Sequence, residues 1–330
     1  MVAQTKQRIK FIDLAKGVCI FLVVIGHSGF PIAIPGWSIV RMPLYFMLSG
    51  LFFKDYGGVK CLCIKKINKI LIPFLFFYLL GYAAFYLIKW LKPELLITES
   101  RGILDLFDNR QFFNGPIWFL LTLFWCNLIF CALTSVVKNN SVNFIFVCAI
   151  GLVGWYLGNE GVFIPLFIDV AMTSLPFFTM GYFLKKTNIL YPNKFDKFNL
   201  LFFAALWLIS ILIENTMHQR MSLHYNIIEG WSTYLLAFTS VMSVIILCKM
   251  INHLPFISYI GRYSIVLLCI HHMIYRPLMV LITHYPHFSF NGFTVAFTTL
   301  ILSALCIPIF IKWIPWFVAQ KDLIHISKKI

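Results

Sequence analysis

The sequence has few charged residues, and fewer of them are acidic than basic. Only 12% of its 330 residues are charged, and just 12 residues are Asp or Glu. Soluble domains carry about 25% charged residues, so the composition excludes an ordinary soluble enzyme. A disordered chain is excluded as well, because disorder requires low hydrophobicity, whereas 60% of this sequence is hydrophobic.

The short motifs of several enzyme classes are also missing. The sequence has no HExxH zinc motif, no CxxC pair, no GxSxG nucleophile turn, no Walker A loop and no dinucleotide-binding glycine fingerprint. We therefore expect no metal site and no permanently bound cofactor. No internal repeat is visible either, which disfavours transporters that are built from inverted repeats.

Apolar residues are abundant and fall into long runs, and the mean hydropathy is +0.85. A helix needs about 20 apolar residues to cross a bilayer. The runs therefore predict an all-α, polytopic membrane bundle, with about ten transmembrane helices in one domain over residues 1–330. The predicted spans are 11–30, 39–53, 70–88, 117–137, 142–158, 166–184, 199–213, 231–250, 262–282 and 293–313.

Basic residues outnumber acidic residues and are concentrated on one side of the predicted membrane. The net charge is +15. If the N-terminus lies inside, all but seven of the 27 basic residues lie on the inner side. The exceptions are Arg41, Lys89, Lys92, Arg101, Arg110, Arg220 and Arg276. This bias follows the positive-inside rule, so it predicts that both termini are cytoplasmic, and it indicates a lipid bilayer rather than a nucleic-acid partner.

Two long connectors are predicted on the outer side. Residues 89–116 carry Glu94, Glu99, Asp105 and Asp108, and residues 214–230 carry two histidines. Connectors of this length are uncommon in compact folds and are often functional. We therefore expect the outer side of the protein to contribute to a binding site.

The first apolar run contains ionisable residues, which are costly inside a membrane and mark functional sites. Lys16 and His27 differ by only about 20° around a helix, so they share one face. Asp13 lies one turn before Lys16 and can pair with it. A neutral imidazole is suited to removing a proton from a hydroxyl, so His27 is the candidate general base. The alternatives are that Lys16 snorkels to the inner interface and that His27 is an interfacial side chain.

A cluster of lysines lies in the connector after the second predicted span. Lys66 and Lys69 are spaced i, i+3 and form one cationic face at the start of the third span, next to Lys65. Such a face can clamp the phosphates of a cytoplasmic ligand. A patch that binds anionic lipid headgroups is the alternative.

Four further residues are candidates for lining a site. Ser49 lies in a Ser-Gly pair of the second span, where small residues permit close helix contact. Trp118 begins the fourth span, where a place in the aromatic belt is the alternative. Ser264 and His271 belong to the ninth span, and His272 follows directly. Because adjacent side chains on a helix point about 100° apart, we expect at most one of the two histidines to face a shared site.

Together these segments resemble the acyltransferase 3 family of integral membrane acyltransferases, and they are most similar to its sugar O-acetylases, which include fucose 4-O-acetylase-like proteins. The resemblance covers residues 11 to about 280. It rests on Asp13-x-x-Lys16-Gly17, Val23-Val24-x-Gly26-His27, Met42-Pro43-Leu44-x-Phe46-x-x-Ser49-Gly50, Trp118-Phe119-Leu120, and Gly261-x-x-Ser264 followed by His271. The sequence departs from the family where Lys66-x-x-Lys69 replaces a common Arg-x-x-Arg pair, and where Leu268 replaces a common Tyr.

The resemblance implies the transfer of an acyl group, commonly acetyl from acetyl-CoA, to a hydroxyl of a glycan or lipid-linked sugar in a bacterial-type inner membrane. The donor would bind from the cytoplasm and the acceptor from outside. His27 would be the general base or a transient acyl carrier, Lys16 would orient the donor or stabilise negative charge, and Asp13 would hold Lys16 in place. Acyl-CoA would bind to Lys65, Lys66 and Lys69, the site would be lined by Ser49, Trp118, Ser264 and His271, and the connector 89–116 would help to select the acceptor.

Two other functions are compatible with the sequence alone. A transporter or flippase of a glycan precursor would use the same polar residues to move its substrate without any acyl donor. A non-catalytic membrane scaffold would leave Lys16, His27 and His271 without a purpose.

Overall fold

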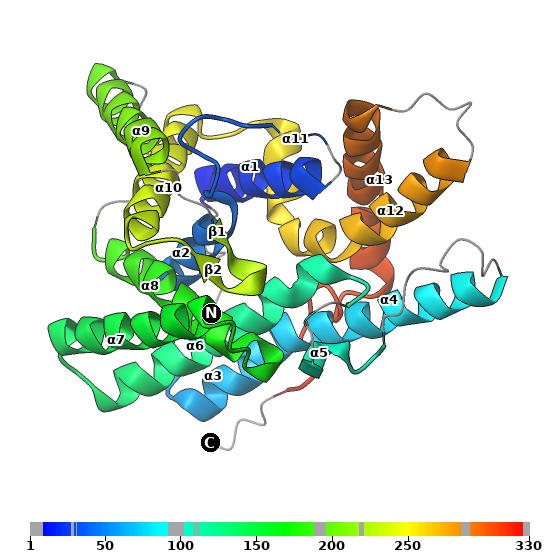
Figure 1. Ribbon diagram of the computed structural model, residues 1–330, viewed down its shortest axis with the longest axis horizontal. Helices are drawn as coiled ribbons and strands as arrows, with labels where there is room; N and C mark the ends of the chain where they lie inside the picture. The colour runs from blue at the N-terminus through cyan, green and yellow to red at the C-terminus, as the bar shows by residue number, and fades with distance from the viewer. Residues whose placement is uncertain are drawn as a thin grey trace, which may run out of the picture.

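The computed structural model describes residues 9–27, 30, 32–91, 102–108, 110, 112–187, 196–217, 221–284 and 291–325. These residues are mostly helical with almost no strand, which confirms the predicted all-α class (Figure 1). The strands among them are β1 (Met221–Ser222) and β2 (Ile227–Ile228), which pair antiparallel with Met221 opposite Ile228.

Eight helical segments of the described chain are long and apolar enough to cross a membrane, so the protein is a multi-pass membrane protein. The first runs through α3 (Val59–Lys66), a π-helical turn (Ile67–Leu71) and α4 (Ile72–Leu91). The others are α6 (Trp118–Val136), α7 (Asn140–Asn159), α8 (Ile168–Leu184), α9 (Lys197–Met217), α10 (Ser232–Ile251), α12 (Ser264–His284) and α13 (Gly292–Trp313).

Two of the ten predicted spans form helices that are not among these eight segments, α1 (Lys10–His27) and α2 (Arg41–Leu51). At 1.5 Å per residue, α2 is only about 16 Å long, roughly half of the hydrocarbon thickness of a bilayer. Most residues of both helices are buried, and Figure 1 shows them enclosed by the longer helices. The close packing of α2 on α8 requires Gly50, because a Cβ at that position would overlap the carbonyl of Phe178.

Two local features differ from the predicted boundaries. A short helix, α11 (Pro255–Arg262), begins at a proline between the eighth and ninth predicted spans and packs on α1. Helix α9 extends beyond the predicted 199–213 at both ends. Its end is fixed by the Glu214 carboxylate, which accepts a hydrogen bond from the backbone N–H of Gly36. A pattern of apolar residues contains no signal for such a partner, because Gly36 lies far away in the sequence.

Candidate active site

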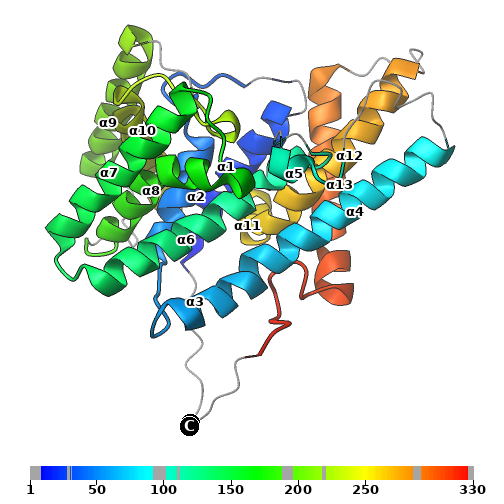
Figure 2. The same cartoon turned by 60° about the horizontal axis from the view of Figure 1, so that its bottom comes forward.

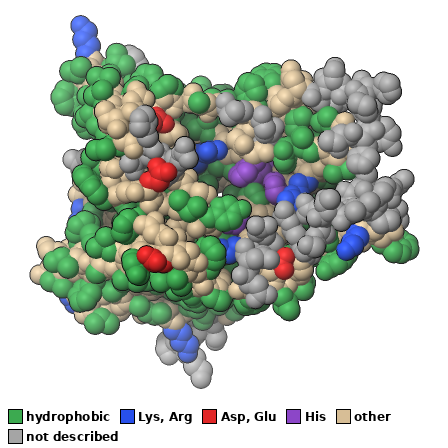
Figure 3. Space-filling view, in the orientation of Figure 1, with side chains coloured by type: hydrophobic (Ala, Val, Ile, Leu, Met, Phe, Trp, Pro, Cys, Tyr) green, Lys and Arg blue, Asp and Glu red, His purple; other side chains and the backbone are tan. Residues whose placement is uncertain are grey.

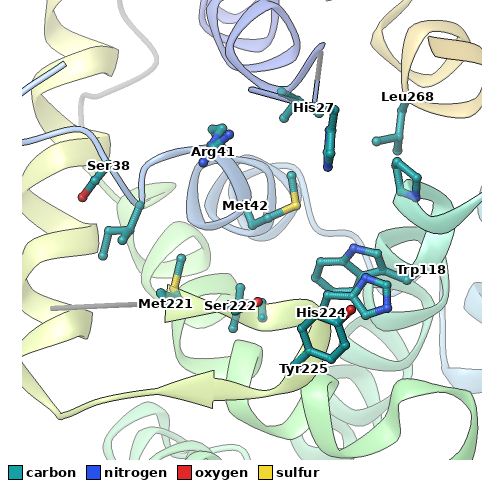
Figure 4. Close-up of a pocket in the computed structure, with 14 residues that line it drawn as sticks. His27, Ser38, Arg41, Met42, Trp118, Met221, Ser222, His224, Tyr225 and Leu268 are labelled. Atoms are coloured by element: carbon teal, nitrogen blue, oxygen red, sulfur yellow. The ribbon is translucent and has the colours of Figure 1, made fainter. Parts of the chain in front are cut away.

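Two cavities lie in the bundle and share one wall residue, Leu268. The first, which we call the histidine cavity, measures about 300 Å³ and contains His27, Arg41, Trp118 and His224. Figure 4 shows these side chains around the opening, and Figure 3 shows histidines at the bottom of a hollow in this face. The second, which we call the lysine cavity, measures about 280 Å³. Its walls include Lys16, Ser49, Lys66, Lys69 and Ser264.

His27 ends α1 and contacts α12 through a second histidine. Nδ1 of His27 lies 3.3 Å from Nε2 of His271, and Nδ1 of His271 lies 2.7 Å from the carbonyl oxygen of Leu267. His271 is completely buried, whereas the ring of His27 borders the histidine cavity (Figure 4). The two rings therefore form a chain that leads from the core of the bundle to the cavity.

This chain determines the position of the imidazole protons when both rings are neutral. A carbonyl oxygen only accepts hydrogen bonds, so His271 must carry its proton on Nδ1 to bond to Leu267. Nε2 of His271 is then an acceptor, and Nδ1–H of His27 is its donor. The lone pair of His27 consequently resides on Nε2, which is the arrangement that a general base requires.

Of the two adjacent histidines, His272 lines a cavity, whereas His271, the residue expected to line the site, is buried behind His27. The ring centroid of His27 lies 5.3 Å from that of His271 and 6.0 Å from that of His272. His272 lines a branch of the histidine cavity together with Arg276. The two rings diverge around α12 as expected, and His27 occupies the last position of α1.

Arg41 is a site residue that the sequence reasoning missed. It begins α2 and lies on the wall of the histidine cavity with His27 (Figure 4). Gly26 makes room for it, because a Cβ at position 26 would overlap Nη1 of Arg41. This contact explains why glycine precedes His27. The available signal was the charge pattern itself, since Arg41 and Arg276 are two of the seven basic residues that oppose the inward bias.

A buried ion pair supports the segment that carries His224. Nη2 of Arg110 lies 2.6 Å from Oδ1 of Asp169, and both side chains are almost inaccessible to solvent. Nδ2 of Asn226 donates to the other carboxylate oxygen of Asp169 at 3.0 Å. Nε2 of His224 lies 2.9 Å from the carbonyl oxygen of Arg110. These contacts hold His224 against Trp118, with 5.6 Å between the ring centroids.

The lysine cavity is built around the π-helical turn at the start of the third span. The turn inserts one extra residue into the helix, and such turns frequently occur at functional sites. It contains Lys69 and follows directly after Lys66, and both side chains line the cavity. Lys16 approaches from α1, with Nζ 5.9 Å from the ring centroid of Phe52. The structure thus places three of the predicted cationic residues in one cavity.

Lys65, by contrast, does not line this cavity but binds the segment that follows α13. Its Nζ lies 2.9 Å from Oδ2 of Asp322, and Nζ of Lys69 lies 2.9 Å from Oδ1 of the same carboxylate. Asn68 bonds to the backbone of Leu323 and Ile324 through its side chain. Hydrogen bonds from the two lysines lower the pKa of Asp322 to about 2. The segment 314–325 therefore fixes the lysine-bearing helix.

The remaining predicted residues are distributed between the two cavities. Trp118 lines the histidine cavity instead of an outer aromatic belt, and Ser49 and Ser264 line the lysine cavity. Asp13 lies one turn before Lys16, where its backbone packs on Gly261 of α11. Residues 92–101 of the predicted acceptor-selecting connector, which include Lys92, Glu94, Glu99 and Arg101, lie outside the described residues. Arg220 lies outside them as well.

The family model of an acyltransferase domain matches residues 9–313 of this chain, which includes both cavities and all of the spans. No curated protein and no solved structure matches the chain significantly. The match extends over nearly the whole sequence and agrees with the resemblance carried by the motifs around Lys16, His27 and Ser49. The chain therefore belongs to the acyltransferase 3 family of membrane acyltransferases.

Proposed function

We propose that this protein transfers an acyl group, in the first instance acetyl from acetyl-CoA, to a hydroxyl of a cell-surface glycan or a lipid-linked sugar precursor. The acyl-CoA would enter the lysine cavity from the cytoplasm, and the sugar would enter the histidine cavity from the outer side of a bacterial-type inner membrane. Acyl-CoA is a substrate in this scheme and not a resident cofactor.

The observation that carries this proposal is the meeting of the two cavities at Leu268. One cavity has the three cations Lys16, Lys66 and Lys69, which suit the phosphates of a CoA thioester. The other contains His27, with its Nε2 lone pair available. Two substrates that enter from opposite sides would place their reacting atoms near the shared wall. The barrier to reaction falls when reactants are held in this way.

The residues of the histidine cavity supply the chemistry of an acyl transfer. Nε2 of His27 removes the proton from the acceptor hydroxyl while that oxygen bonds to the thioester carbonyl carbon. The carbonyl oxygen becomes negatively charged, and the guanidinium of Arg41 on the same wall stabilises it. The carbon–sulfur bond then breaks, and the thiolate of CoA receives the proton from His27, which returns to its neutral form.

The walls of the histidine cavity also suit a sugar. Trp118, His224 and Tyr225 present flat rings, and Ser38 and Ser222 add hydroxyl groups (Figure 4). Sites of this composition combine apolar contact area with a few polar groups that fix the orientation of the ligand. A sugar ring has apolar C–H faces and polar edges, so its surface is complementary to this wall.

The test compares the surface glycans of cells that contain the wild-type protein, the His27→Ala variant or no protein. Mass spectrometry should find glycans heavier by one acyl group only in cells with the wild-type protein. His253→Ala is the matched control, because His253 is exposed in the connector before α11, away from the cavities. Acylated glycans at the wild-type level in cells with well-expressed His27→Ala would refute the role of His27.

A further inference from the structure

A third cavity, which we call the three-lysine pocket, lies where α2, α6, α7 and α8 end or begin. It measures about 590 Å³, and it is polar for a cavity in such an apolar protein. Lys54, Lys138 and Lys185 lie in its walls with a single acidic residue, Asp55. The pocket therefore has a net positive lining and is suited to an anion with more than one negative charge.

Two of these lysines are held in place by backbone carbonyls. Nζ of Lys185 donates to the carbonyl of Phe53 at 3.1 Å, and Nζ of Lys138 donates to that of Thr134 at 3.3 Å. An ammonium group has three N–H donors, so each of these side chains is oriented by one bond and retains donors for a ligand. Compact ammonium groups of this kind are well-known phosphate binders.

Asn143 provides an independent indication of a ligand, because its buried side chain leaves an acceptor without a partner. The residue is 5% exposed and lines the pocket, and its Oδ1 accepts no hydrogen bond within the described structure. Buried polar atoms are almost always satisfied, so a donor group from a ligand is expected here. The amide of Asn pairs with the N6 amino group and N7 of adenine. Tyr56 and Tyr182 add aromatic rings to the same wall.

The three-lysine pocket and the lysine cavity adjoin the same two helices. Phe52 at the end of α2 lines the lysine cavity, and Phe53 lines the pocket. Along α6, Leu123 lines the cavity and Thr134 lines the pocket, about 16 Å apart at 1.5 Å per residue. Figure 2 shows the α6–α7 turn and the α2–α3 connection on the same side of the bundle. The charge bias predicts that this side faces the cytoplasm.

We propose that the three-lysine pocket binds the 3′-phosphoadenosine end of an acyl-CoA, whose pantetheine arm extends into the lysine cavity. The lysines hold the phosphates, Asn143 pairs with the adenine edge, and the thioester lies near Leu268. The assignment rests on the proposed acyl transfer and adds the part of the donor that is recognised.

The first experiment measures binding of 3′,5′-ADP to the purified full chain in nanodiscs, without turnover. Saturable binding is expected for the wild-type protein, and the double variant Lys138→Gln/Lys185→Gln should bind about tenfold more weakly. Lys60→Gln is the control, because Lys60 is exposed on α3 and lines none of the three cavities. Equal binding by the wild-type and double-variant proteins, or no binding by the wild-type protein, would overturn the proposal.

A second comparison separates adenine recognition from general anion binding. Asn143→Leu should weaken the binding of 3′,5′-ADP but not that of inorganic phosphate, because only the nucleotide carries a base. If inorganic phosphate or phosphatidylglycerol vesicles compete as strongly as the nucleotide, the pocket is a general anion or lipid site and the adenine assignment is wrong. These readouts require no acyl transfer. A wild-type protein that binds 3′,5′-ADP as proposed but transfers no acyl group would refute the proposed function alone.

A third experiment compares the steady-state kinetics of the variants once acyl transfer has been observed. The double variant should raise the KM for acetyl-CoA about tenfold with kcat unchanged, as expected for lost ground-state binding. Dephospho-CoA thioesters lack the 3′-phosphate, so the double variant should raise their KM by a smaller factor than it raises the KM for acetyl-CoA. An unchanged KM in an active double variant would contradict the donor subsite and leave the role of His27 untouched.

Discussion

Nδ1 of His27 lies 3.3 Å from Nε2 of His271, and the other nitrogen of His271 is occupied by the carbonyl of Leu267. The buried histidine thus orients the exposed one and fixes its tautomer. In the acyl transfer proposed above, His271 touches no substrate and acts only through His27. We therefore regard His271 as a positioning residue and His27 as the catalytic residue.

The first prediction concerns His271. His271→Phe keeps a ring in the core but removes the acceptor for His27, so kcat should fall about 100-fold, the lower range of what a positioned base contributes. The KM for acetyl-CoA should not change. His271→Gln, whose amide oxygen can accept from Nδ1 of His27, should recover part of the loss. A Phe variant with normal kcat, or a Gln variant no better than Phe, would show that His271 only fills space.

The second prediction concerns Gly26. A Cβ at this position meets the flexible end of Arg41 and not backbone, so Gly26→Ala should fold normally but displace the guanidinium. We expect kcat to fall by about 100-fold, as for loss of an oxyanion donor, with Tm unchanged. Gly50→Ala provides the contrast, since its Cβ would overlap backbone of Phe178. That variant should lose about 1–3 kcal/mol of stability.

Gly81→Ala on α4 is the control for both glycine variants. A Cβ at Gly81 would meet its nearest neighbours, in Phe113 and Asn114, at ordinary van der Waals distances of 3.4 Å or more, and Gly81 lines none of the cavities, so the activity should not change and the Tm should not fall. If Gly26→Ala retained full activity, Arg41 would not act on the oxyanion from its present position. If it unfolded the protein, the contact would be structural instead.

The third prediction concerns Leu268, the wall residue common to both cavities. Leu268→Trp should block the opening and reduce kcat for every donor. Leu268→Ala should widen it, and each added methylene of the acyl group should then be tolerated about tenfold better in kcat/KM than in the wild-type protein. The measurement compares acetyl-, propionyl- and butyryl-CoA with the same acceptor.

The matched control for this series is Leu305→Ala on α13, since that leucine is 62% exposed on the outside of the bundle. Leu268→Ala also removes a buried side chain and should lower stability by about 2–5 kcal/mol, so its kinetics need to be measured below its Tm. An acyl-length preference identical to that of the wild-type protein would place the reacting carbonyl away from Leu268.

The fourth prediction concerns the pH dependence of the contact between Asp322 and the two lysines. Because the pKa of Asp322 is lowered to about 2, its contribution is complete above its ordinary pKa and is lost as pH falls through the lowered value. Asp322→Asn should therefore increase hydrogen exchange of residues 314–325 by the same factor at every pH from about 5 to 8. Glu160→Gln, at the exposed end of α7, should have no effect there.

A difference between Asp322→Asn and the wild-type protein that disappears within the range from about pH 5 to 8 would contradict the lowered pKa. Equal exchange in both proteins throughout that range would show that the hydrogen bonds of Asn68 hold the segment without the ion pairs. Lys65 would then have no detectable role in fixing this part of the chain.

The helical class and the approximate positions of the spans were predictable because each depends on local composition. The apolar runs give the eight long helical segments of the described chain. The short length of α2 was visible in the sequence, but its burial inside the bundle was not. That burial depends on Gly50 of α2, which lies against the backbone of Phe178, and on Gly181 of α8, which lies against the backbone of Met47.

The candidate site was only partly predictable for the same reason. His27, Lys66 and Lys69 stand out because charge is rare in an apolar sequence. Arg41 was noted only as one of the seven basic residues outside the inward bias, since its proximity to His27 arises from the packing of α1 on α2. The pairing of Lys65 with Asp322 joins residues 257 positions apart. No local pattern specifies such a contact.

In the proposed reaction, His27 removes the proton from an acceptor whose donor enters from the opposite cavity. The most direct test reconstitutes the purified protein in liposomes with acetyl-CoA labelled in the acetyl group on one side and the sugar acceptor on the other. We expect labelled acceptor with the wild-type protein and a loss of at least about 100-fold with His27→Ala, with 3′,5′-ADP binding unchanged. Transfer by His27→Ala at the wild-type rate, with the acetyl-CoA bound normally, would show that His27 is not the base.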